Sequence, residues 1–205
     1  METDPETPVV FDDAADRALM QRIARGDTSA FERLYVIYEK PVGNFLYRMC
    51  YDTALAEDCL QETFLRLWKA APGWRGESKV STFIFQISKN LGLDAKEKAA
   101  REKTRLGSGR TDDEDRPPAA ALKDVPDPAS SPAHQMEDEE LREAVRRALD
   151  ELPGDQRLIV QLSQTEGLTY REVADILGVP LGTVKSRMAA AADTLRRKLI
   201  RHVRA

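Results

Sequence analysis

Consecutive polar side chains near the start of an expected C-terminal helix, Lys185, Ser186 and Arg187, are of the kinds that hydrogen-bond DNA. In the major groove, Lys and Arg can meet guanine edges, and Ser can meet several bases. The same groups can contact phosphate oxygens, so base reading and backbone binding both remain open for them. Arg157 and Arg171, nearer to the preceding helices, are predicted phosphate contacts.

A helix, a turn and a longer helix are expected to position these side chains. Residues 169–172 (TYRE) form a capping box in sequence, which predicts that a helix starts there. Gly178 can end that helix in the left-handed conformation, and Pro180 suits the first turn of the next one. The small Ala174 and the apolar Val184 are spaced to pack the two helices together, as in a helix-turn-helix. A helical hairpin that only packs is the alternative.

The rest of the chain is also expected to be helical, in an all-α fold with two small domains. Apolar residues recur at helical spacing through residues 14–105, and Pro41 should kink or divide the second helix there. The expected N-caps are Thr28 or Ser29 for the second helix, Asp52-Thr53 for the third and Ser81-Thr82 for the fourth. Residues 139–205 form the second domain.

Between and before these domains, the composition predicts disorder. Residues 1–13 carry five acidic and no basic side chains, and residues 106–138 are rich in Pro, Asp and small residues without an apolar face. We therefore expect a disordered N-terminus and a flexible acidic linker. The formal net charge of −4 hides two mildly basic domains: residues 14–105 have 16 bases against 12 acids, and residues 139–205 have 12 against 10.

Two stretches resemble one known family. GVPLGTVKSRM, with LPGDQRLIVQLSQTEGLTYREVADIL before it, resembles the promoter-reading module of the extracytoplasmic-function (ECF) group of bacterial sigma factors, in the sigma-70 family. AEDCLQETFLRLWKAAPGWRGESKVSTFIFQISKNLGLDA resembles the part of these factors that binds core RNA polymerase and opens the −10 element. The resemblance implies that residues 14–105 are sigma region 2 and residues 139–205 are sigma region 4, which reads the −35 element.

The resemblance also implies a −10 surface around the loop 74–79 and the helix after it. Its members are Trp74, Arg75, Ser78, Lys79, Phe83, Lys89 and Asn90. Aromatic rings can stack on unpaired bases, and basic groups can follow a single-stranded backbone. Trp74 and Phe83 could instead be core anchors of a short loop.

The implied partners are core RNA polymerase, through the β′ clamp helices and the β flap, and promoter DNA, both duplex and single-stranded. Asp58, Gln61, Glu62 and Leu65 are the expected polymerase contacts, and an anti-sigma factor is a further partner that the resemblance allows. The run Ala189–Ala192 departs from the family, whose members commonly have bulkier or basic residues there, which puts the −35 affinity in doubt. A sigma-like interaction module and a stand-alone helix-turn-helix repressor remain as alternatives.

Catalysis and membrane insertion are not expected. His134 and His202 have no nucleophile or acid spaced to form a triad, no phosphate-binding Gly loop occurs, and neither a metal nor a cofactor is implied. Cys50 and Cys59 are predicted to be buried free thiols. No apolar run approaches the roughly 20 residues of a membrane span, and the acidic N-terminus is unlike a signal peptide, so we expect a cytoplasmic protein.

Overall fold

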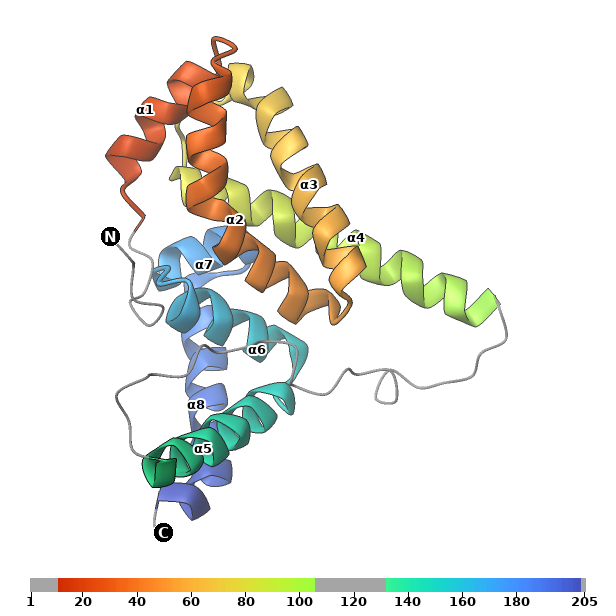
Figure 1. Ribbon diagram of the computed structural model, residues 1–205, viewed down its shortest axis with the longest axis vertical. Helices are drawn as coiled ribbons and strands as arrows, with labels where there is room; N and C mark the ends of the chain where they lie inside the picture. Colours follow the sequence, from red (N-terminus) through yellow and green to blue (C-terminus); the bar gives the residue numbers. More distant parts are fainter. Residues whose placement is uncertain (1–10, 106–131, 204–205) are drawn as a thin grey trace.

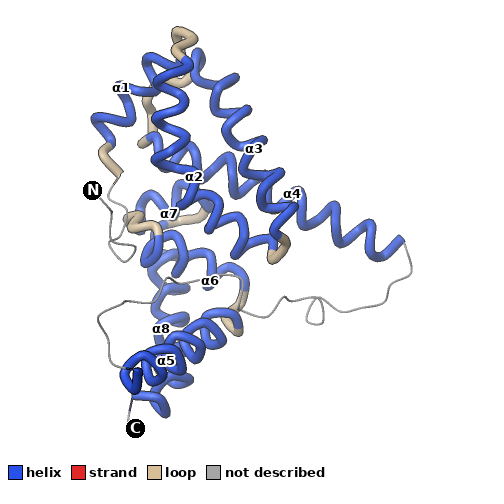
Figure 2. Tube along the Cα trace, viewed as in Figure 1, coloured by secondary structure: helices blue, strands red, loops and turns tan. Residues whose placement is uncertain are grey.

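The computed structural model describes residues 11–105 and 132–203, and all regular structure within these ranges is helical (Figures 1 and 2). The N-terminal unit contains α1 (Asp13–Ile23), α2 (Thr28–Cys50), α3 (Thr53–Ala70), the 3-10 turn η1 (Ala71–Gly73) and α4 (Val80–Arg105). The C-terminal unit contains α5 (Pro132–Asp150), α6 (Gly154–Val160), the π-helical turn η3 (Gln161–Thr165), α7 (Tyr170–Leu177) and α8 (Leu181–Val203). The predicted all-α fold is confirmed.

Aspartates cap α1, α2 and α3 of the N-terminal unit. The Asp52 carboxylate accepts from the amide of Leu55 at 2.9 Å, as predicted for α3. The cap of α2 is Asp27, one residue before the predicted Thr28 or Ser29, and its carboxylate accepts from the amide of Ala30 at 3.1 Å. Hydrogen bonds from Ser29 and Arg22 hold the pKa of Asp27 at about 2, so the capping group stays ionised.

The prediction for the start of α4 was also wrong. The helix begins at Val80, and Ser81 and Thr82 lie buried in its first turn instead of capping it. The Lys79 carbonyl already accepts from the amide of Phe83 at 3.1 Å. Burial of the two hydroxyl residues follows from the packing of this turn on the core, which sequence periodicity does not report.

Helix α2 runs through Pro41 without interruption, and Figure 1 shows that it changes direction about half-way along. Proline lacks an amide proton and its ring crowds the preceding turn, which bends a helix without necessarily ending it. The Pro41 side chain and its neighbour Val42 are buried, so packing on one side holds the bent helix together.

The core of the N-terminal unit lies among α2, α3 and α4, and α1 closes one side of it. Asp16 of α1 is buried there and accepts a 2.5 Å hydrogen bond from the hydroxyl of Tyr38 on α2. Phe11 stacks on the ring of Tyr38 with 4.7 Å between centroids. Residues 11–13, which we expected to be disordered, are thus ordered by an aromatic contact; residues 1–10 lie outside the described residues.

In the C-terminal unit, α5 and α6 both pack on the long helix α8. Helix α5 begins at Pro132, so the last seven residues expected in the linker 106–138 are helical. Proline is well tolerated in the first turn of a helix, and strong helix formers follow it here. Residues 106–131 lie outside the described residues.

The two units contact each other through α4 and α7, and one continuous cluster of buried apolar side chains includes Phe85 and Ile84 from α4 and Val173 and Ile176 from α7. Figure 1 shows α7 against the N-terminal unit, with α6 and α8 beyond it, while the C-terminal end of α4 projects away from the body. No helix in the described residues is long and apolar enough to cross a membrane.

Candidate nucleic-acid and polymerase interfaces

Helices α7 and α8 form the predicted helix-turn-helix. The Thr169 hydroxyl accepts from the amide of Glu172 at 3.4 Å, and the Glu172 carboxylate accepts from the amide of Thr169 at 2.7 Å, which completes the capping box. Gly178 ends α7 with a φ of 68°, a left-handed conformation that a Cβ would strain. Ala174 and Val184 are buried between the helices. The N-terminal turns of α8 therefore have a fixed orientation.

The side chains predicted to contact the −35 element differ in their exposure and in their contacts with other protein groups. Lys185 and Arg171 are exposed, whereas the Ser186 hydroxyl, also exposed, donates back to the Thr183 carbonyl at 3.1 Å. Arg187 is more constrained, since its Nη1 lies 2.9 Å from Oδ2 of Asp155 on α6. Arg157 is held most firmly: it donates to the Asp150 carbonyl at 3.0 Å, and its guanidinium lies 5.0 Å from the ring centroid of Tyr51.

One alanine of the run on α8 is part of the core of the C-terminal unit. Ala191 is fully buried and packs against Leu152 and Val160, where α5 and α6 meet α8. Ala189, Ala190 and Ala192 are exposed on the other sides of the helix. A small residue at 191 allows the close approach of the helices, and a larger side chain there would overpack the contact.

The predicted −10 residues occupy the loop after η1 and the first turns of α4. Arg75 and Asn90 are exposed, and Lys89 is half-buried. Trp74 and Phe83 are half-buried. Each side chain packs in part against the apolar core and is in part exposed to solvent. The structure thus places these residues on the loop and on the first three turns of α4.

Arg17 of α1 contacts this loop and was not predicted from the sequence. Its Nη1 donates to the Gly76 carbonyl at 2.9 Å and its Nη2 to the Ser78 carbonyl at 3.1 Å. Its guanidinium also lies 5.5 Å from the ring centroid of Trp74. In the sequence Arg17 is one more arginine of an amphipathic helix, and only the fold carries it to a loop about 60 positions away.

Lys79 links this loop to the helix-turn-helix. Its Nζ lies 2.9 Å from Oε1 of Glu172, and nearby the Gln86 amide donates to the Asp175 carbonyl at 2.8 Å. Burial by itself would raise the pKa of Glu172, but the hydrogen bonds from Thr169 and Lys79 outweigh it and the pKa is lowered. The hydrogen bond with Glu172 in turn raises the pKa of Lys79. Both groups are therefore charged at neutral pH.

A second polar contact between the units surrounds Glu166, just before α7. Its carboxylate is 3 % exposed, and Arg48 Nη1 approaches Oε1 only to 4.0 Å, too far for a hydrogen bond. Burial raises the pKa of Glu166 to about 7, and the charge of Arg48 offsets this only in part. The Tyr51 hydroxyl donates to Asp150 at 3.1 Å on the same side of the molecule.

The face of α3 predicted to meet polymerase is open. Asp58 and Gln61 are exposed, and Leu65 is 51 % exposed. Glu62 forms an ion pair with Arg66 one turn later at 2.8 Å.

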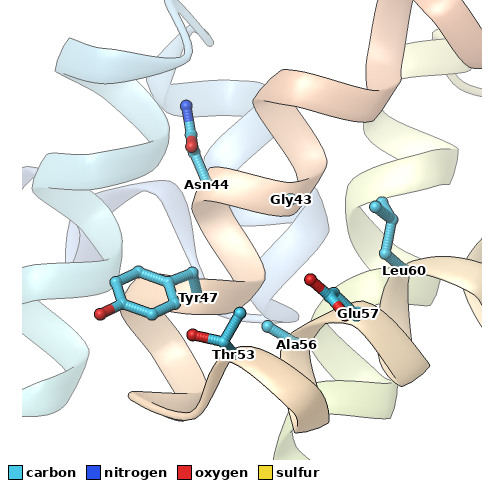
Figure 3. A pocket seen from close by; sticks show the side chains of 7 residues that line it. All are labelled: Gly43, Asn44, Tyr47, Thr53, Ala56, Glu57 and Leu60. Atoms are coloured by element: carbon cyan, nitrogen blue, oxygen red, sulfur yellow. The ribbon is translucent and has the colours of Figure 1, made fainter. Parts of the chain in front are cut away.

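A groove of about 250 Å³ lies between α2 and α3 on the same unit (Figure 3). Tyr47 and Asn44 line it from α2, and Glu57 and Leu60 line it from α3. The groove is therefore lined in part by α3, the helix that also carries the expected polymerase contacts Asp58 and Gln61.

The two cysteines differ in burial. Cys59 is buried, as predicted, whereas Cys50 is only half-buried. Burial raises the pKa of Cys50 to about 12, which disfavours the thiolate needed for metal binding or nucleophilic attack. Within residues 11–105 and 132–203, no group of three His, Cys, Asp or Glu side chains is placed to hold a metal ion.

Family models match both units. The model of sigma-70 region 2 matches residues 34–102, and the model of sigma-70 region 4 matches residues 142–195. The ECF RNA polymerase sigma-E factor of Escherichia coli (strain K12) is 30 % identical over 184 residues, which cover 90 % of this chain and 94 % of the relative. The RNA polymerase sigma-H factor of Pseudomonas aeruginosa is 29 % identical over 184 residues, with 90 % and 93 % covered.

Solved structures share the fold. RpoE of Bartonella quintana, in complex with the anti-sigma factor NepR, has a TM-score of 0.63 at 22 % identity and covers 82 % of this chain and 96 % of its own. CnrH, in complex with the cytosolic domain of CnrY, has a TM-score of 0.61 at 20 % identity and covers 90 % of this chain and 97 % of its own. With both regions matched in order and a 30 % identical relative covered almost throughout, this chain belongs to the ECF group of sigma-70 family sigma factors.

Proposed function

We propose that the protein binds core RNA polymerase and directs promoter-specific initiation by recognising −10 and −35 elements. The observation that carries this proposal is that one chain combines a helix-turn-helix, with Lys185 exposed near the start of α8, and a separate basic and aromatic loop before α4. A duplex-reading module and a surface for unpaired bases are what a polymerase needs to find and open a promoter. The chemistry of RNA synthesis belongs to the polymerase.

At the −35 element, α8 would enter the major groove by its N-terminal turns. Lys185 and Ser186 are the candidates for base contacts, since both are exposed. Arg171 would meet phosphate. Arg187 and Arg157 would have to exchange the protein partners Asp155 and Asp150 for DNA, so their contribution to affinity would be smaller than that of a free arginine.

At the −10 element, the loop 74–79 would receive an unpaired base of the non-template strand. Trp74 and Phe83 offer partly exposed rings for stacking, while Arg75, Lys79, Lys89 and Asn90 would contact backbone or base edges. The Ser78 side chain would complete the polar lining. Unstacking a base costs a few kcal/mol, which contacts of this kind can offset.

The polymerase itself would be met by Asp58, Gln61, Glu62 and Leu65 on α3, with the β′ clamp helices as the partner, and by the C-terminal unit on the β flap. The exposure of Leu65 supports this assignment, because burying an apolar side chain at an interface is favourable. We also propose that an anti-sigma factor can bind the chain, as NepR binds RpoE of Bartonella quintana. The protein would act in the cytoplasm, where the polymerase is.

We propose further that residues 14–105 and 139–205 act as separate domains at the promoter, with residues 106–131 and the start of α5 as the connection. A fully extended chain of the length of 106–131 reaches roughly 85 Å, more than enough to span two promoter elements. The contact between α4 and α7 would then be given up when the two units bind polymerase.

In vitro transcription with bacterial core polymerase and a library of random promoters tests this function. Selective initiation dependent on the added protein, with enriched −35 and −10 sequences, is the expected result. If folded protein supports initiation from no promoter yet binds an anti-sigma protein, the chain is an interaction module. If the free protein binds duplex operators as a dimer, it is a repressor.

A further inference from the structure

We propose that Arg17 is a positioning residue for −10 recognition: it fixes the loop 74–79 in the shape that receives the unpaired base. The inference deepens the proposed function and rests on it for its consequence at promoters. Arg17 itself belongs to α1, which precedes the residues matched by the region 2 model.

The geometry of the contact is that of a clamp. The Arg17 fork spans the loop, with Nη1 donating to the Gly76 carbonyl at 2.9 Å and Nη2 donating to the Ser78 carbonyl at 3.1 Å. On its other edge, Nε donates to Asp13 at 2.8 Å, and this ion pair within α1 aims the guanidinium at the loop. A planar guanidinium can satisfy these groups together, whereas the ammonium of lysine has no fixed fork.

The loop is shaped to match this clamp. Gly76 has a φ of 74°, and a Cβ placed there would lie 2.8 Å from Arg17 Nη1. A side chain at position 76 would therefore be strained by the backbone conformation and would also displace the end of the Arg17 side chain. Trp74 packs on the same guanidinium, so its indole is also oriented by Arg17.

Ordering the loop before DNA binds favours every base alike, because it removes the same entropic cost from each complex. Preference for one base depends instead on the positions at which the loop carbonyls and the Trp74 ring are held. Small displacements of the supporting groups also weaken a binding site disproportionately. Removing the clamp should thus reduce the preference for the correct base more than it reduces general affinity for single strands.

The test compares Arg17→Met and Arg17→Lys with Arg22→Met in the full-length protein bound to core polymerase. Arg22 is a matched control, because it lies on the same helix and also makes two polar contacts, to Asp27 and Ser29, but none to the loop. The probes are single-stranded oligonucleotides with the non-template −10 sequence selected by the wild-type holoenzyme, and with each of the other three bases at the most selective position.

We expect Arg17→Met to reduce the ratio of affinities for the best and worst base by about tenfold, the scale of a lost charge-assisted hydrogen bond. Arg17→Lys should restore part of that ratio, and Arg22→Met should match wild type. Core binding should be unchanged in all three. An unchanged ratio in Arg17→Met, or an equal loss of affinity for all four bases, would overturn the inference.

A second readout needs neither polymerase nor promoter. In a Trp68→Phe background the only tryptophan is Trp74, and its emission in the free full-length chain reports the loop. Arg17→Met should make Trp74 more accessible to acrylamide quenching, and Arg22→Met should not. Identical quenching in both variants rejects the clamp even if the proposed function is correct, whereas a wild-type protein that never initiates rejects the proposed function alone.

Discussion

Lys79 Nζ and Glu172 Oε1 lie 2.9 Å apart, and this ion pair joins the loop before α4 to the capping box of the helix-turn-helix. Lys79 of the expected −10 surface is therefore paired with Glu172 of the helix-turn-helix that is expected to read the −35 element. A lysine ammonium has three donors, but the ion pair with Glu172 would compete with the DNA contact that we propose for Lys79. We therefore propose that the two units separate before the −10 surface binds a promoter in full.

The first prediction is that weakening this ion pair opens the two units. Glu172→Gln keeps an N3 acceptor for the capping box but removes the charge, so α7 should survive while the contact to Lys79 weakens. Lys79→Met removes the same pair from the other side. Because Lys79 is half exposed, the pair contributes about 0.5 to 1 kcal/mol, a severalfold shift in the open population.

Small-angle scattering of the free protein measures this shift as a larger radius of gyration. Both single variants should expand the protein to the same extent, and the double variant should expand it no further, because all three lose one interaction. Added salt should expand wild type but have less effect on the variants. Scattering curves that superimpose on wild type would contradict a role of the pair in closure.

The second prediction concerns pH and Glu166. Its folded pKa is raised from 4.5 to about 7, so the protonated form is favoured in the folded protein. The stability that this group contributes is fully present below pH 4.5 and is lost as the pH rises through 7. Glu166→Gln should therefore stabilise the protein by about 3 kcal/mol at pH 8, and by much less at pH 5.

Thermal melting at both pH values checks this sign, with Glu97→Gln as an exposed control whose ion pair with Arg101 lies far from the contact. Burial of Glu166 raises its pKa more than the 4.0 Å contact with Arg48 lowers it. A lower melting temperature of Glu166→Gln at pH 8 would show instead that the ion pair dominates.

The third prediction is that Tyr38→Phe destabilises the N-terminal unit by about 1 to 3 kcal/mol, the cost of leaving a buried polar group without its partner. Asp16 would lose the 2.5 Å hydrogen bond that compensates for its burial, which already raises the pKa of Asp16. Tyr35→Phe is the control, since the Tyr35 hydroxyl bonds Glu39 at an exposed site. Urea unfolding at pH 7 measures both, and equal stabilities would refute the pairing.

The fourth prediction tests the −35 helix with Lys185→Ala and Arg187→Ala combined. Initiation from promoters that depend on the −35 element should fall by at least about tenfold, and the salt slope of binding should decrease by up to about two. Arg196→Ala with Arg197→Ala, further along α8 and paired with Asp193, is the matched control. A parallel loss of core binding would show that the Arg187–Asp155 ion pair is what matters.

The fifth prediction tests the polymerase face of α3. Asp58→Arg with Glu62→Arg reverses two charges and places a second cation beside Arg66, so association with core polymerase should weaken by roughly tenfold or more. Glu97→Arg controls for reversal of a similar helical ion pair on α4. Undiminished association in a pull-down would reject this interface.

Local features of the fold could be predicted because neighbouring residues determine them. The capping box at 169–172, the turn at Gly178 and the burial of Val184 follow from contacts within a few residues and from helical periodicity. The N-cap of α2 shows the limit of such reasoning. Asp27, Thr28 and Ser29 are all good caps, and the bonds from Arg22 and Ser29 to Asp27 decide among them.

Contacts between distant residues were decided only by the tertiary structure. Arg17 meets Gly76, Lys79 meets Glu172 and Arg48 approaches Glu166, and none of these pairs is distinguishable in the sequence from many other arginines, lysines and glutamates. A charged side chain on a helix gives the same local signal whether it is solvated or paired. Which of the two occurs depends on the burial that packing of remote helices creates, and periodicity within one helix carries no information about that.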